Sequence, residues 1–142
     1  MLIAGRCHCD NVSFSLDWSP DPTSIPARAC SCSFCVKRGG VWTACPTGRL
    51  RVSLRDSSKV SLYTFGTKTA VFHVCSVCGV TPVVTSLIDG RLYAVVSVNA
   101  LEGLPSGLVQ PATTVRFDVE TEAERLARRK RGWIADVAFE RG

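Results

Sequence analysis

The alternation of polar and apolar residues along the first two thirds of the chain predicts β-strands. Residues 11–17 and 49–55 alternate strictly, as strands do when they bury one face. Asp89-Gly90 between two apolar runs predicts a tight hairpin. A last strand is expected at 114–119. Four further strands are predicted where β-branched and aromatic residues are concentrated, at 60–65, 70–75, 81–87 and 92–98.

One helix is predicted, near the C-terminus. Thr121 has the position of an N-cap, acidic residues follow it directly, and basic residues are frequent from 125 to 131, before Gly132. This order complements the helix dipole. The proline-containing stretch 18–28 is expected to be a loop. No linker or repeat divides the chain, so we expect one mainly β domain over residues 1–142 with a short C-terminal helix.

The composition is that of an ordinary globular protein. Hydrophobic residues make up 46% of the 142 residues and charged residues 20%. No apolar run reaches the roughly 18 residues that a membrane-spanning helix needs. Cys7 follows the first residues so closely that we expect no signal peptide. The sequence therefore predicts a cytoplasmic protein with no membrane partner.

Eight cysteines are the main chemical signal in the sequence. An even number in a secreted protein would suggest disulfides, but cytosolic thiols are kept reduced, and clustered thiols there more often hold metal. Thiolates two or three residues apart can bind one zinc ion from a tight turn. Seven of the eight form three such groups, C-x-C at Cys7 and Cys9, C-x-C-x-x-C at Cys30, Cys32 and Cys35, and C-x-x-C-G at Cys75 and Cys78.

These groups can make two kinds of zinc site. Two pairs give a closed four-cysteine site, whereas a group of three leaves a fourth position open for catalysis or exchange. Spacing alone leaves open which pairs combine, although joining the first pair to the last is economical because the group of three stays intact. Two alternatives remain. The pairs could be buried free thiols, or a fourth side chain could complete the group of three as a structural site.

Three further residues have candidate roles near these groups. Cys45 stands alone and is interpreted as a free thiol, with a role as a fourth ligand as the alternative. His8 lies between two cysteines and should point away from a metal that they share. His73 faces the same side of its strand as Cys75. It could approach a metal, but we favour a hydrogen-bonded packing role.

Three cysteine-containing segments together resemble a known family. They are GRCHCDNV at 5–12, CSCSFCVKRG at 30–39 and FHVCSVCG at 72–79. In order and spacing they are similar to the glutathione-dependent formaldehyde-activating enzymes, a family that includes a centromere-protein branch and has an Mss4-like fold. The resemblance covers about residues 5–99, and the C-terminal strand and basic helix at about 114–131 follow it.

The resemblance implies a fold, a set of metal ligands and a reaction. The fold would be folded antiparallel sheets tied together by zinc. The family's reaction is the condensation of formaldehyde with glutathione to S-hydroxymethylglutathione, classed as that of a carbon–sulfur lyase. By position, the implied structural zinc ligands are Cys7, Cys9, Cys75 and Cys78, and the implied ligands of a second, catalytic zinc are Cys30, Cys32 and Cys35.

The chemistry of three thiolates is compatible with that reaction. A zinc ion with three thiolate ligands carries a net negative charge, so it should ionise water poorly but accept an incoming thiol well. A reaction that makes or breaks a carbon–sulfur bond in a thiol adduct is therefore reasonable, with a glutathione-like thiol and an aldehyde as partners. Lys37 and Arg38 either hold a carboxylate of such a substrate or are solvated surface charges.

Two other functions compete with this one. The net charge is +5, and the basic residues at 125–131, close to Trp133, could contact nucleic acid or an acidic protein in a non-catalytic zinc module. A solvated helix end is the favoured interpretation, so nucleic acid is not an expected partner. The second is a redox role for Cys75 and Cys78. A redox C-x-x-C pair should open a helix, whereas these two cysteines lie between two predicted strands, which argues against this function. Exposed strand edges would permit a homodimer.

Overall fold

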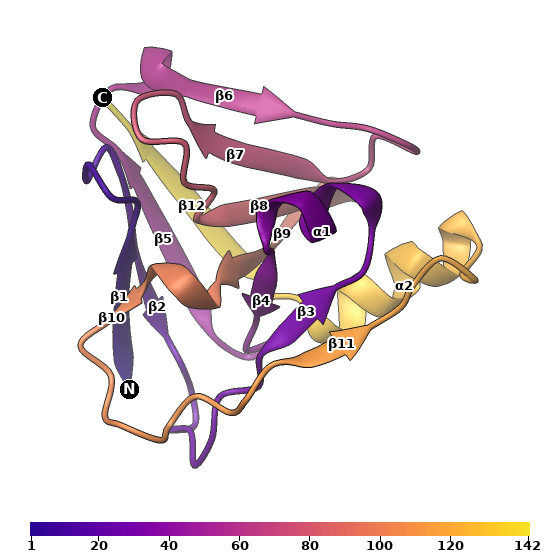
Figure 1. Cartoon of the computed structure of the whole chain (residues 1–142), viewed down its shortest axis with the longest axis horizontal. Coiled ribbons are helices and arrows are strands. Elements are labelled where there is room, and N and C mark those ends of the chain that lie inside the picture. Colours follow the sequence, from indigo (N-terminus) through magenta and orange to yellow (C-terminus); the bar gives the residue numbers. More distant parts are fainter.

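Twelve strands form two sheets in this computed structural model, which describes residues 1–142 (Figure 1). The first sheet has the strand order β10-β1-β2-β5-β12. Its strands are β1 (Leu2–Arg6), β2 (Val12–Asp17), β5 (Arg49–Leu54), β10 (Leu101–Glu102) and β12 (Asp136–Arg141). The fold is mainly β, as the sequence predicts.

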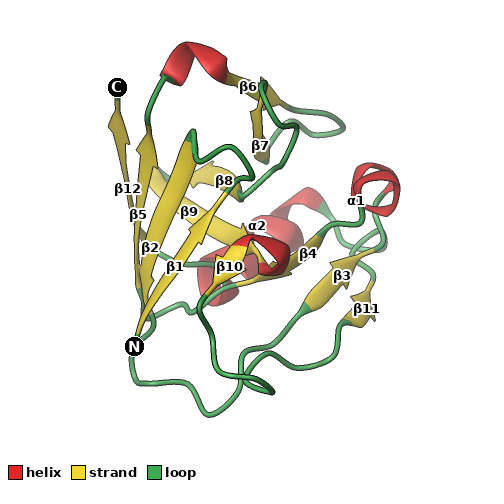
Figure 2. Cartoon of the chain, turned by 60° about the vertical axis from the view of Figure 1, so that its left-hand side comes forward, coloured by secondary structure: helices red, strands yellow, loops and turns green.

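The second sheet has seven strands in the order β11-β3-β4-β9-β8-β7-β6. Figure 2 shows β1, β2, β5 and β12 of the first sheet side by side, with β3, β4 and β11 on the other side of the molecule. The strands of the second sheet are β3 (Arg28–Cys30), β4 (Val41–Thr43), β6 (Val60–Tyr63), β7 (Val71–Cys75), β8 (Val83–Ile88), β9 (Arg91–Ser97) and β11 (Thr113–Val115).

The strict alternation at 11–17 and 49–55 gives β2 and β5, which pair antiparallel. Their inward-facing residues lie directly opposite one another, so that Val12, Phe14 and Leu16 face Leu54, Val52 and Leu50. All six side chains are buried. They belong to a cluster of 22 buried residues to which both sheets contribute. The alternation thus sets which face of the first sheet becomes core.

The C-terminal strands depart from the antiparallel arrangement that the family resemblance implies. β12 pairs parallel with β5, and β11 pairs parallel with β3. Just before β12, Ile134 exchanges two backbone hydrogen bonds with Ala94 of β9, of 2.9 and 3.0 Å. The chain therefore passes from the second sheet to the first at this point. The predicted strand at 114–119 is too long, because β11 ends at Val115.

Two α-helices and two short 3-10 helices, η1 (Ser57–Lys59) and η2 (Val98–Ala100), complete the fold. The predicted C-terminal helix is α2 (Glu122–Gly132), where Thr121 and Glu124 form a reciprocal capping box. The expectation of a single helix is wrong, because α1 (Ser33–Arg38) forms within the group of three cysteines. No helix is both long and apolar enough to cross a membrane.

Candidate metal centres and the adjoining pocket

The first and last cysteine pairs lie in two turns of similar construction. In residues 7–12, the Cys7 N–H donates to the Val12 carbonyl at 2.8 Å; in residues 75–80, the Cys75 N–H donates to the Val80 carbonyl at 2.9 Å. Each turn needs one residue in the left-handed region, Asp10 with φ 68° and Gly79 with φ 81°. Each turn therefore presents two sulfurs from a tight loop at a strand end.

The structure brings these two turns together into a four-cysteine cluster of Cys7, Cys9, Cys75 and Cys78, with all four sulfurs within 4.8 Å of one another. The sulfur of Cys9 lies 3.7 Å from that of Cys7 and 3.4 Å from that of Cys75. A tetrahedral zinc–thiolate site with bonds of about 2.3 Å has sulfur–sulfur edges of about 3.8 Å. The cluster therefore fits a zinc ion with little movement.

The surroundings of the four-cysteine cluster favour a thiolate. Burial alone would raise the pKa of Cys78, but backbone N–H groups of Val80 and Cys9 and the neighbouring thiols lower it to about 6. Burial raises the pKa of Cys7 to about 12. A cluster that stabilises a thiolate at Cys78, and holds further thiols beside it, has the donor set of a closed structural site.

The remaining group forms a separate three-cysteine cluster of Cys30, Cys32 and Cys35, whose sulfurs also lie within 4.8 Å of one another. Cys30 ends β3, and the Cys32 sulfur caps α1 by accepting a hydrogen bond from the Cys35 N–H at 3.3 Å. Gly39 closes the helix in the left-handed conformation. The short helix thus turns all three sulfurs toward one point.

Within the three-cysteine cluster, interactions between the thiols shift the pKa values of Cys30 and Cys35 in opposite directions. The Cys35 thiol lowers the pKa of Cys30 to about 5, and the positive charge of Arg128 contributes in the same direction. Interaction with Cys30, together with burial, raises the pKa of Cys35. The cluster therefore favours a thiolate at Cys30. No fourth histidine, cysteine or carboxylate belongs to this group, so the three sulfurs could hold a metal ion and leave its fourth coordination position open.

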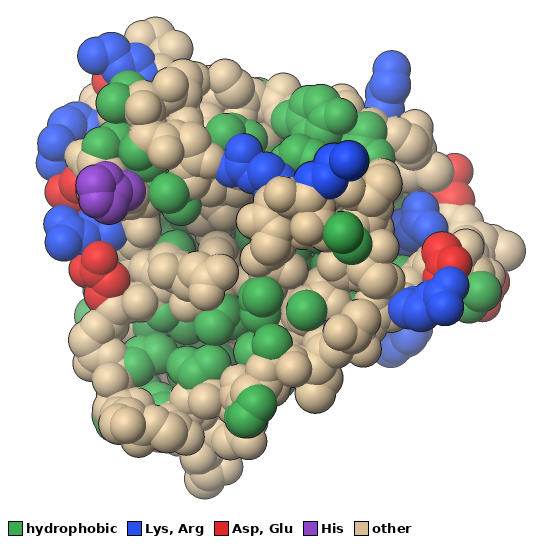
Figure 3. All heavy atoms as spheres, viewed as in Figure 1, with side chains coloured by type: hydrophobic (Ala, Val, Ile, Leu, Met, Phe, Trp, Pro, Cys, Tyr) green, Lys and Arg blue, Asp and Glu red, His purple; other side chains and the backbone are tan.

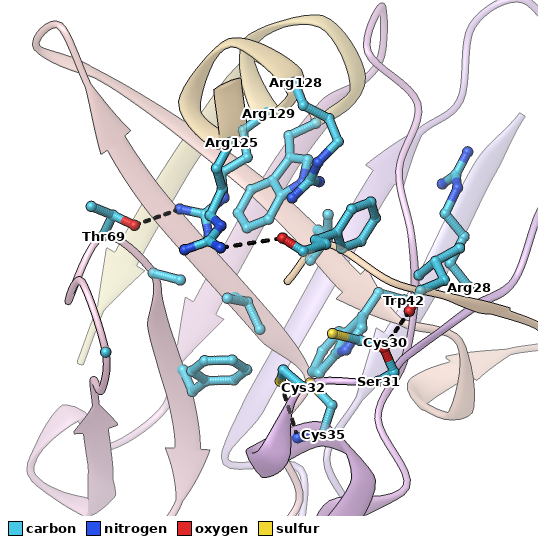
Figure 4. A pocket seen from close by; sticks show the side chains of 18 of the residues that line it. Arg28, Cys30, Ser31, Cys32, Cys35, Trp42, Thr69, Arg125, Arg128 and Arg129 are labelled. Carbon is cyan, nitrogen blue, oxygen red and sulfur yellow. Dashed lines mark hydrogen bonds between the residues drawn. The ribbon is translucent and has the colours of Figure 1, made fainter. Parts of the chain in front are cut away.

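A pocket of about 610 Å³ adjoins the three-cysteine cluster. Thirteen of its 24 lining residues are hydrophobic, and they include Trp42, Phe65, Phe72 and Trp133. Figure 4 shows the cysteines at one end of the pocket and three arginines of α2 at the other. This combination of a soft donor cluster, apolar walls and guanidinium groups can bind a molecule with a thiol at one end and an anionic group at the other.

The expectation of a solvated helix end is wrong for three of the basic residues of α2, whereas Lys130 and Arg131 are exposed. Arg125, Arg128 and Arg129 line the pocket, and Arg129 is only 7% exposed. Lys130, on another side of the helix, pairs with Asp89 at 3.0 Å. On the face in Figure 3, acidic side chains are interspersed with basic ones at both ends of the molecule, so this face has no continuous basic surface.

Lys37 and Arg38 do not line the pocket, although the sequence made them candidates for holding a substrate carboxylate. Lys37 is exposed on α1. Arg38 donates hydrogen bonds to the Gly79 carbonyl and to the Thr81 hydroxyl, the latter at 2.9 Å. The sequence named the arginines of α2, close to Trp133, only as a candidate contact for nucleic acid or an acidic protein, and did not predict that they line the pocket.

The other candidate residues lie outside both cysteine clusters. Cys45 is buried, and its sulfur contacts the Ser19 carbonyl at 3.6 Å, so it is a free thiol. His8 is exposed. His73 is buried, and its Nε2 lies 2.8 Å from the Thr85 hydroxyl. Burial lowers the pKa of His73 to about 4, so it packs as a neutral ring against Phe139.

The fold and these sites define a mainly β protein built around two cysteine clusters that could each hold a zinc ion. The family model described as glutathione-dependent formaldehyde-activating enzyme matches residues 2–118, and the chain belongs to this family. A crystal structure of a Rhodobacter sphaeroides protein is 33% identical and has a TM-score of 0.56. That alignment covers 78% of this chain and 99% of the other.

Proposed function

We propose that the protein is a zinc-dependent enzyme that forms or cleaves a carbon–sulfur bond in a thiol adduct such as S-hydroxymethylglutathione. The observation that carries the proposal is the position of the three-cysteine cluster at one end of a pocket with guanidinium groups at its other end. Membership of the glutathione-dependent formaldehyde-activating family supports the choice of thiol and aldehyde. The reaction class is that of a carbon–sulfur lyase.

The two clusters have different tasks in this proposal. Cys7, Cys9, Cys75 and Cys78 would hold a structural zinc that joins the N-terminal turn to the turn after β7. Cys30, Cys32 and Cys35 would hold the second zinc. Bound there, zinc would supply a soft site that favours the thiolate form of an incoming thiol.

The other task of the pocket in this proposal is to position the thiol and the aldehyde for bond formation. In the forward direction a bond forms between the thiol sulfur and the aldehyde carbon, the S–H bond breaks, and the proton ends on the former carbonyl oxygen. The apolar walls around Phe72 and Trp42 exclude water from the reacting groups, and the arginines orient the anionic end of the thiol compound. We also propose that residues 1–142 act as one domain in the cytoplasm, where thiols stay reduced.

The reaction can be followed directly by exchange NMR. Carbon-13 formaldehyde and glutathione equilibrate without a catalyst, so the enzyme should increase the exchange rate between hydrated formaldehyde and the adduct without shifting their equilibrium. We expect that increase with the parent protein and its loss in a Cys30→Ser variant. A Cys45→Ser variant is the matched control, because Cys45 lies in neither cluster. Equal exchange rates with and without the parent protein would overturn the proposal.

A further inference from the structure

Arg129 is a buried cation without an anionic partner. It is 7% exposed, and its Nη1 donates to the hydroxyls of Thr69 and Ser86 at 2.9 and 3.1 Å. Neither hydroxyl carries a charge, and Arg129 takes part in no ion pair. Its Nε is buried and has no hydrogen-bond partner. A charge buried in this way is costly unless something compensates it.

The neighbouring groups leave the arginine end of the pocket positive. Glu120 is the carboxylate beside the three arginines, and Arg128 occupies it with two hydrogen bonds of 2.9 and 3.1 Å. Arg125 reaches Glu120 only at 3.9 Å. Asp118 pairs with Arg116 at 3.0 Å. One carboxylate therefore lies beside three guanidinium groups and is engaged mainly by Arg128, so the excess positive charge lies at Arg125 and Arg129.

Arg129 is held in a fixed position. Its guanidinium carbon lies 4.9 Å from the centre of the Trp133 ring, which covers one face of the group. Burial, and the charges of Arg128 and Arg125, lower the pKa of Arg129 to about 10, so it stays protonated at neutral pH. A rigid cation that lines a largely apolar pocket and has no carboxylate partner is suited to bind a carboxylate.

We propose that Arg129 and Arg125 form an anion site that selects substrates by a carboxylate, while the apolar walls of the pocket contact the carbon chain next to it. This inference deepens the proposed function, because it names the substrate class of the same pocket. Hydrophobic side chains such as Phe65, Val84 and Trp133 would contact the body of such a molecule. The site belongs to α2, which lies beyond residues 2–118 that the family model matches, so the selectivity is a property of this chain's C-terminal segment.

Phenylacetate and phenylacetamide test the anion site without any reaction. They have nearly the same shape and differ in charge, and neither contains a thiol. Titration of the zinc-loaded protein would be followed by NMR, through the Nε–H resonance of Arg129 and the indole resonance of Trp133. We expect phenylacetate to bind at least about tenfold more tightly than phenylacetamide, because only the carboxylate makes charge-assisted hydrogen bonds.

The variants Arg129→Gln and Arg125→Gln should each reduce this ratio to below about threefold. Arg131→Gln is the matched control, since Arg131 is exposed on the same helix and does not line the pocket. If Arg129→Gln fails to fold, Arg125→Gln decides the question. A ratio near one in the parent, or a ratio preserved in the folded pocket variants, would overturn the inference. Failure of the formaldehyde reaction would leave this binding result intact, so the two failures are distinguishable.

Discussion

The guanidinium of Arg38 donates a hydrogen bond of 2.9 Å to the hydroxyl of Thr81 and so joins α1 to the loop after Cys78. The same side chain also donates to the Gly79 carbonyl. Because α1 contains Cys35, this contact connects the elements that carry the two cysteine clusters. Arg38, which the sequence made a candidate for holding a substrate carboxylate, thus has a structural role instead.

Replacing Arg38 by Met should lower the free energy of unfolding by about 1 kcal/mol, because two hydrogen bonds to a charged group are lost at a partly exposed site. Urea denaturation of the zinc-loaded protein measures the change. Lys37→Met is the matched control, since Lys37 is exposed on the same helix and lies outside the pocket. Equal stability of the two variants would show that the link to Thr81 contributes nothing.

Gly40 lies against the three-cysteine cluster. A Cβ at this position would be 2.9 Å from Nε1 of Trp42 and 3.1 Å from Cβ of Cys35. Gly40→Ala should therefore displace Cys35 and reduce bound zinc from about two to about one per chain, because ligation needs sulfurs within a few tenths of an ångström of their positions. Elemental analysis measures this. Gly132→Ala, where no atom lies within 4 Å of the added carbon, should retain both ions; equal loss in both variants would contradict the account.

Gly5 leaves room for the ring of Phe14, its register partner on β2. A Cβ on Gly5 would lie 2.6 Å from Cε2 of that ring. Gly5→Ala should destabilise the fold by about 1–3 kcal/mol through overpacking. In a Phe14→Leu background the cost should fall by about 1 kcal/mol or more, since the clash is removed. Chemical denaturation gives both values, and an unchanged cost in the double variant would show that the two residues are not coupled.

The parts of the fold that follow from local pattern were predictable from the sequence. Alternation identified β2 and β5, and Thr121 with the acidic residues after it identified α2. β12 was missed because its alternation is short and its partner, β5, is more than 80 residues earlier in the chain. α1 was missed because its six residues include no strong helix-forming run, and its caps depend on a cysteine sulfur and a left-handed glycine.

The candidate site, like the fold, has one part that the sequence predicts and one part that depends on tertiary packing. The spacing of Cys30, Cys32 and Cys35 identified them as one group because local spacing limits which sulfurs can meet. The anion site was not predictable, since Arg129 meets Thr69 only through the packing of α2 against the second sheet. Charge patterning along a helix shows which residues are basic, but it does not show which face becomes buried.

The four-cysteine cluster should contribute most of the stability that metal provides. Cys75→Ser removes a fully buried thiol of this cluster, so it should release one zinc and lower the free energy of unfolding by about 3 kcal/mol or more. Cys45→Ser, at a buried thiol outside both clusters, should keep the full zinc content. Thermal denaturation with parallel zinc analysis measures both effects. A Cys75→Ser protein that keeps its zinc and its stability would exclude a structural metal at this cluster.

Zinc per chain, measured by elemental analysis on the parent and on a Cys30/Cys32/Cys35→Ser triple variant, tests the central claim most directly. Serine is a good N-cap, so the change at Cys32 should preserve α1. We expect about two zinc ions in the parent and about one in the folded variant, because each cysteine cluster would bind its own ion. One zinc ion in both proteins, or none in either, would contradict the claim that the three-cysteine cluster is a separate zinc site.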